Sequence, residues 1–89
     1  MTTPTVDYSG LPESLRAGAR RWVEDHVAPG GFLCAVIRND LSEAVALADD
    51  NNLPLLPEIV RWFYNEAPGP CWGSVHALDE WRAAGMVAP

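Results

Sequence analysis

The chain has 89 residues, 48% hydrophobic and 20% charged, so it can bury one modest core and is too apolar to be wholly disordered. Its formal net charge is −6, and all six basic residues are arginine. A net negative chain does not bind nucleic acid by neutralising phosphates, whereas it complements a protein with a basic surface. We find no secretory signal and no apolar run near the roughly 18 residues of a membrane span, so we expect a cytoplasmic protein.

The first expected helix covers about residues 12–27, after a mobile arm over residues 1–9. A proline in the first turn and Glu13 near the positive end of the helix dipole favour this start. One face of it holds an apolar series with a histidine at its end, namely Leu11, Leu15, Ala19, Trp22, Val23 and His26. The sequence Ala-Pro-Gly-Gly at residues 28–31 is expected to end the helix.

Residues 32–37 are apolar throughout, which is typical of a buried strand or a short buried helix. The chain offers no second strand to pair with, so we predict a helix. Asp40 as N-cap, with Glu43 three residues later, predicts the start of the next helix. Its apolar residues, Leu41, Ala44, Val45 and Ala48, have the spacing of one helical face.

Two further helices are expected, one over about residues 54–67 and one from Ser74, a good N-cap, to about Ala84. The first has a broad apolar arc, made of Leu55, Leu56, Ile59, Val60, Phe63 and Ala67, which suggests the central helix of the bundle. Gly85 would stop the last helix, and residues 86–89 would form a tail. The sequence therefore predicts an all-α fold, a single domain over residues 1–89 built as a compact bundle of four to five short helices.

The sequence carries no catalytic, metal-binding or cofactor-binding motif, so we expect a protein that is not an enzyme and needs no cofactor. The segment around Gly30 lacks the lysine of a phosphate-binding loop, and residues 49–52 lack the spacing of a calcium loop. Cys71 and His76 form a conceivable nucleophilic pair, but no third group orients them. Cys34 is expected to be a buried hydrophobe, and an exposed Cys71 in a proline-rich turn could cross-link two molecules.

Acidic and aromatic residues are the candidates for a partner-binding surface. Asp49 and Asp50 follow a helix C-terminus, where carboxylates oppose the helix dipole; the alternative, which we favour, is that they simply form a good turn. Trp72 lies beside a glycine and either plugs the core or contacts a partner. For His26 we favour a hydrogen bond to a backbone carbonyl at the core rim over a pH- or partner-sensitive contact. The predicted surface consists of Asp49, Asp50, Glu24, Asp25, Asp79, Glu80, Trp62, Tyr64 and Trp72.

The segments at residues 29–44 and 59–68, followed by Cys71-Trp72-Gly73-Ser74, resemble a group of small proteins encoded by phages and prophages of GC-rich proteobacteria. The resemblance covers about residues 11–82. Such small acidic proteins include anti-CRISPR proteins, which bind a CRISPR–Cas complex and block DNA capture or nuclease recruitment. The group has no established functional motif, so the resemblance assigns no site residue.

The resemblance implies an inhibitor that binds a basic, nucleic-acid-binding surface of a CRISPR–Cas effector in the bacterial cytoplasm. The protein itself would bind neither nucleic acid nor a membrane, and we expect a monomer or a weak dimer. The alternative is a phage accessory or regulatory protein that binds another host protein, with no link to CRISPR.

Overall fold

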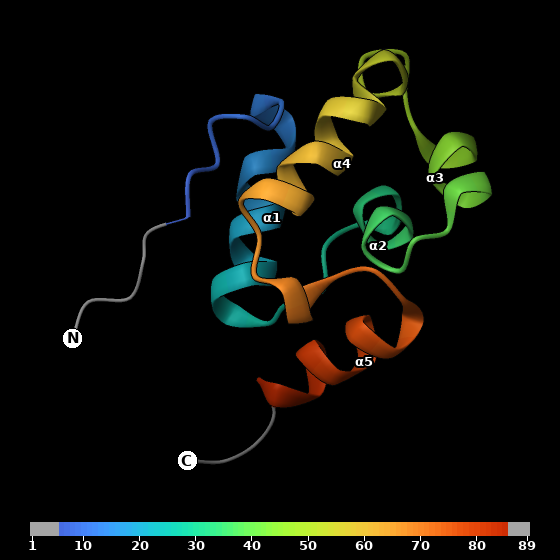
Figure 1. The fold of residues 1–89 in the computed structure, drawn as a ribbon. Coiled ribbons are helices and arrows are strands. Elements are labelled where there is room, and N and C mark those ends of the chain that lie inside the picture. The colour runs from blue at the N-terminus through green and yellow to red at the C-terminus, as the bar shows by residue number, and fades with distance from the viewer. Residues whose placement is uncertain (1–5, 86–89) are drawn as a thin grey trace.

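A computed structural model describes residues 6–85, and this part of the chain holds five α-helices, two single 3-10 turns and no strand (Figure 1). The helices are α1 (Glu13–Asp25), α2 (Gly31–Ile37), α3 (Leu41–Leu47), α4 (Leu56–Asn65) and α5 (Val75–Ala84), and the turns are η1 (Leu53–Leu55) and η2 (Gly69–Cys71). The predicted all-α, single-domain fold of short helices is confirmed.

Helix α2, and not α4, lies in the middle of the bundle, where it packs against α1, α3 and α5 (Figure 1). An apolar helix with no polar face has to be covered on all sides, and four of its seven residues are buried: Leu33, Ala35, Val36 and Ile37. Helix α4 covers one side of the core with its own buried residues, Leu56, Ile59, Trp62 and Phe63. The wide apolar arc of α4 is therefore divided between the core and the surface.

Two of the predicted helix starts, those of α3 and α5, are confirmed by their side-chain caps. The backbone N–H of Glu43 donates to Asp40 Oδ1 over 3.2 Å, and the N–H of Ala77 donates to Ser74 Oγ over 3.0 Å. Each cap satisfies an N–H group that would otherwise lack a partner at a helix N-terminus. Both caps are local in sequence, which is why the sequence predicts them.

Helix α1 ends two residues earlier than predicted, because His26 adopts the left-handed conformation with φ of 60°. The N–H of Val27 then bonds back to the carbonyl of Arg21, which closes the helix. The His26 Nδ1 donates to the carbonyl of Trp81 over 2.7 Å, and the two rings lie 4.4 Å apart. The interpretation of His26 as a rim histidine bonded to a carbonyl is confirmed.

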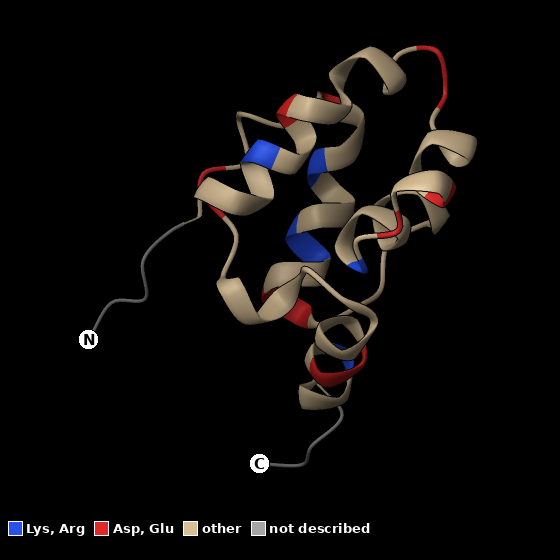
Figure 2. Cartoon of the chain, turned by 45° about the vertical axis from the view of Figure 1, so that its right-hand side comes forward, with Lys and Arg blue, Asp and Glu red and all other residues tan. Residues whose placement is uncertain are grey.

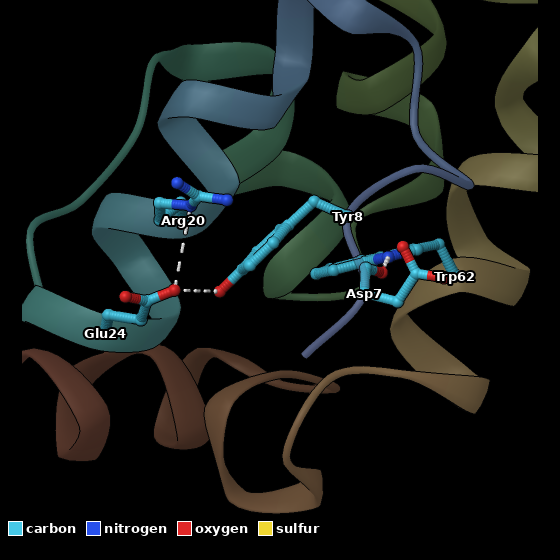
Figure 3. A network of polar contacts seen from close by, with 5 residues as sticks. All are labelled: Asp7, Tyr8, Arg20, Glu24 and Trp62. Atoms are coloured by element: carbon cyan, nitrogen blue, oxygen red, sulfur yellow. Dashed lines mark hydrogen bonds and ion pairs between the residues drawn. The ribbon is translucent and has the colours of Figure 1, made fainter. Parts of the chain in front are cut away.

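The predicted mobile arm is wrong for the described residues 6–9, because two of its groups bond to distant helices (Figure 3). Tyr8 is 6% exposed, and its hydroxyl donates to Glu24 on α1 over 2.9 Å. The Trp62 Nε1 donates to the carbonyl of Asp7 over 2.7 Å. The segment therefore straps α1 to α4. The rest of the predicted arm, residues 1–5, and the predicted tail, residues 86–89, lie outside the described residues.

Helix α3 also differs from the prediction, since its apolar stripe does not face the core. Only Ala44 is buried, while Leu41 is 67% exposed and Val45 is 44% exposed. The helix is seven residues long and packs mainly against α2. The stripe is therefore left at the surface beside α4.

Candidate protein-binding surface

The six predicted acidic residues do not form one patch (Figure 2). Asp49 and Asp50 lie in the loop between α3 and η1, at the opposite end of the molecule from α5, which carries Asp79 and Glu80. The remaining two, Glu24 and Asp25, lie in the last turn of α1. A single acidic surface that imitates the phosphates of DNA is therefore not what the fold presents.

Several of these carboxylates already have partners within the chain. Glu24 Oε2 accepts a hydrogen bond from the hydroxyl of Tyr8 and lies 3.7 Å from Arg20 Nε. Figure 3 shows both contacts. On α5, Arg82 lies 3.3 Å from Asp79, and His76 lies 3.6 Å from Glu80. These surface pairs are mostly solvent-exposed, so each contributes little to stability. Arg20 and Arg82 also offset part of the negative charge that α1 and α5 present to a partner.

Asp49 has a structural role that explains its position. Its Oδ1 accepts hydrogen bonds from the backbone N–H groups of Asn51 over 3.0 Å and of Asn52 over 2.7 Å. Helix α3 ends at Leu47 with Ala48 as its C-cap, and the carboxylate of Asp49 accepts N–H groups of the turn that follows. The turn interpretation is confirmed for Asp49. Binding of a partner by Asp49 or Asp50 remains a prediction.

The three predicted aromatic anchors occupy three different environments. Trp62 is 3% exposed and its ring packs edge-on against Phe63, so its predicted role as a surface anchor is wrong. Tyr64, two residues further along α4, is 79% exposed. Trp72 is half-buried; its ring lies 5.6 Å from that of Phe63 in the core and 6.5 Å from that of Tyr64 at the surface. Trp72 therefore connects the core with the exposed Tyr64.

Tyr64 and Trp72 border an open apolar groove between α3 and α4. Its outer part, of about 400 Å³, is lined by Leu41, Leu56, Pro57, Val60, Arg61 and Tyr64. Its inner part shares Leu41, Leu56 and Val60 with the outer part and ends against Ala44 and Trp72. We call this surface the α3–α4 groove, defined by Leu41, Ala44, Leu56, Val60, Tyr64 and Trp72.

Helical spacing groups Leu41 with one apolar face and Leu56 and Val60 with another, and it does not reveal the groove between them. Val60 is 39% exposed, and Leu41 is more exposed still. One signal was available in the sequence: the apolar arc of α4 is wider than a single core contact requires. Only the placement of the short helix α3 shows which part of that arc stays uncovered.

Cys71 is more buried than Cys34, although the sequence predicted Cys34 as the buried one of the two. Cys71 is fully buried, and its carbonyl accepts the indole N–H of Trp22 over 2.9 Å. Burial raises the pKa of the Cys71 thiol to about 12. Cys34 is only partly buried; its thiol donates to the carbonyl of Pro29 over 3.2 Å, and burial raises its pKa. Cys71 is therefore not available to cross-link two molecules in the folded protein, and His76 is exposed and lies beside Glu80.

Within residues 6–85, no three His, Cys, Asp or Glu side chains gather closely enough to hold a metal ion. In the same range no helix is long and apolar enough to cross a bilayer. No protein family, curated protein or solved structure was found to match this chain. The α3–α4 groove and the charges around it are therefore the basis for assigning a function.

Proposed function

We propose that the protein is a non-enzymatic inhibitor that binds a CRISPR–Cas effector in the bacterial cytoplasm and blocks DNA binding or nuclease recruitment. The observation that carries the proposal is the α3–α4 groove, where Leu41 and Tyr64 are 67% and 79% exposed. Large apolar side chains left uncovered together are typical of a protein-interaction site, and tyrosine is frequent among the residues that dominate binding energy. The class of target comes from the resemblance to phage-encoded inhibitors.

The charge of the whole chain supports a basic target. Its formal net charge is −6, whereas the groove itself is lined by Arg61 and by Asp40, which lies 3.6 Å from Arg38 Nε. Charge of this kind attracts a basic protein surface and speeds its association, while apolar contacts supply most of the affinity. In this proposal the acidic residues steer the effector, and the groove holds it.

The test is a plaque assay in two isogenic bacterial strains, one with CRISPR immunity against the challenging phage and one without CRISPR. Expression of the protein should restore phage growth in the immune strain and change nothing in the other strain. An equal effect in both strains would support the accessory or regulatory alternative. No effect in the immune strain, with the protein present in soluble form, would contradict the proposal.

A further inference from the structure

We propose that α5 is a detachable cover over α2, which opens as one unit while α1, α2 and α4 stay folded. Contacts between Trp81 and the end of α1 hold this cover closed. The inference goes beyond the proposed function and does not rest on it, because it concerns a second state of the same fold. In that open state an apolar side of α2 becomes accessible.

Helix α5 buries little of its own surface. It packs against α2 and η2 at one end of the molecule (Figure 1). Leu78 is the one buried residue among its ten, and seven of the ten are exposed, whereas α4, which has the same length, buries four. An element with few buried apolar contacts opens at a lower free energy than the core does. Specific contacts therefore matter more for holding α5 in place.

These specific contacts join Trp81 to the end of α1, and we call them the Trp81 clasp. The indole N–H of Trp81 donates to the carbonyl of Trp22 over 2.8 Å, and Nδ1 of His26 donates to the carbonyl of Trp81 over 2.7 Å. The rings of His26 and Trp81 also lie 4.4 Å apart. His26 makes its contacts from a left-handed conformation that residues other than glycine rarely adopt. All of these contacts involve Trp81, so they are lost together when α5 leaves.

Gly85, directly after α5, allows this end of the helix to approach His26. A Cβ at Gly85 would lie 2.5 Å from the Cβ of His26, which is closer than real side chains come. The φ of Gly85 is −73°, a value that alanine also adopts, so glycine is needed for the contact and not for the backbone. Gly85→Ala is therefore a selective way to loosen the clasp.

The detaching unit begins after Gly73. The N–H of Gly73 donates to the carbonyl of Ile37 on α2 over 2.6 Å, so the chain is tied to the core just before α5. The φ of Gly73 is 111°, and apart from its chain neighbours no described atom lies within 4 Å of the position that a Cβ would take. The backbone is therefore free to turn there. A helix of ten residues is marginal in water by itself, so α5 should unwind as it leaves.

The experiment is native-state hydrogen exchange on the full chain, followed by NMR at low concentrations of urea. Two indole N–H groups are compared: that of Trp81 belongs to the clasp, and that of Trp22 donates to the carbonyl of the buried Cys71 over 2.9 Å. We expect the Trp81 indole and the backbone N–H of Leu78 to share one opening equilibrium. That opening should be at least about 100-fold more populated than the one that frees the Trp22 indole. Urea should promote it less steeply, because it exposes less surface than global unfolding does.

A core variant distinguishes the opening of α5 from global unfolding. Ile59 is fully buried on α4, and Ile59→Val should destabilise the whole domain enough to speed exchange of the Trp22 indole about two- to tenfold. The contacts of Ile59 persist when only α5 leaves, so exchange of the Trp81 indole should not change.

A second pair of variants tests the clasp itself. Gly85→Ala creates the close contact with His26 and should speed exchange of the Trp81 indole by about tenfold. The matched control is Gly30→Ala, because Gly30 has a φ of −65° and open space around the position of a Cβ, and it should leave this rate unchanged. If Gly85→Ala does not fold, His26→Gly takes its place, since glycine keeps the left-handed end of α1 and removes the imidazole.

The inference is overturned if the Trp81 indole exchanges no faster than that of Trp22, or if it does not share an opening with Leu78. It is also overturned if Ile59→Val speeds both indoles equally, since α5 would then open only together with the whole domain. An unchanged Trp81 rate in the clasp variant, or an equal increase in Gly30→Ala, overturns the assignment of the clasp as the contact that holds α5.

Discussion

Replacing Tyr8 with alanine should destabilise the protein by about 3–5 kcal/mol, the usual cost of removing a buried aromatic side chain. Tyr8 is 6% exposed, and its ring lies 5.4 Å from the ring of Trp62, with the guanidinium of Arg20 5.0 Å from its centroid. A domain of 89 residues has a total stability of about 4–13 kcal/mol. The single substitution should therefore remove a large part of the free energy of unfolding.

Replacing Tyr8 with phenylalanine measures how much the hydroxyl alone contributes to the free energy of unfolding. That hydroxyl donates to Glu24 Oε2 over 2.9 Å, and a hydrogen bond to a charged acceptor is worth about 1.5–3 kcal/mol when shielded from water. The Glu24 side chain is 54% exposed, so water competes for it, and we expect a loss of about 1 kcal/mol. The difference between the two substitutions then measures the packing of the ring.

The assay is urea unfolding followed by tryptophan fluorescence, with Ser9→Ala as the control because Ser9 is exposed and lies in the same segment. The control should lie within about 0.5 kcal/mol of the wild type. If Tyr8→Ala also falls within that range, residues 6–9 form a free arm, and their assignment to the core is incorrect.

Three further predictions concern buried and capping groups. Burial raises the pKa of Cys71 from 9.0 to about 12, so the unfolded chain loses the thiol proton at a lower pH than the folded protein does. The contribution of Cys71 to the free energy of unfolding should be complete below pH 9 and should fall by about 1.4 kcal/mol per pH unit between pH 9 and 12. Urea unfolding across that pH range should show this fall in the wild type and not in Cys71→Ala. In the native state a thiol reagent should modify the partly exposed Cys34 well before the fully buried Cys71, and equal rates would contradict the burial of η2. Asp49→Ala should lower the free energy of unfolding by about 1 kcal/mol, measured by thermal unfolding, because two N–H groups lose their acceptor. Asp50→Ala should stay within about 0.5 kcal/mol of the wild type, and a larger loss for Asp50→Ala than for Asp49→Ala would contradict the capping role of Asp49.

Features that depend on neighbouring residues could be predicted from the sequence. The caps at Asp40 and Ser74 each involve a backbone N–H three residues away, and the short buried helix α2 follows from a run of apolar residues with no strand to pair with. These signals lie within one or two helical turns, so no knowledge of the tertiary structure was needed.

Features that depend on distant contacts could not be predicted. Tyr8 and Glu24 are 16 residues apart, and Trp62 and Asp7 are 55 residues apart, so no local pattern shows that residues 6–9 form a strap. The same strap places Trp62 in the core and thereby removes it from the predicted surface. Cys71 is buried for a similar reason, since the indole of Trp22, 49 residues away, donates to its carbonyl.

The candidate surface was predicted only in part. Tyr64 and Trp72 were both predicted as partner-binding residues, and the structure brings their rings within 6.5 Å of each other; their binding of a partner stays a prediction. Their apolar neighbours Leu41 and Val60 could not be selected, because helical spacing shows which residues share a face but not whether another helix covers it. The position of α3 against α2 determines whether Leu41 is covered by another helix.

The function that we propose, inhibition of a CRISPR–Cas effector, would depend on the α3–α4 groove. The most direct measurement compares the wild type, a groove variant with Leu41→Gln and Tyr64→Gln, and Val75→Gln, which changes an exposed apolar residue on α5. All three are tested in the plaque assay, at equal soluble levels, in strains with and without CRISPR. We predict that the wild type and Val75→Gln restore phage growth only in the immune strain and that the groove variant does not. Restoration by all three proteins, or by none of them, would contradict the account.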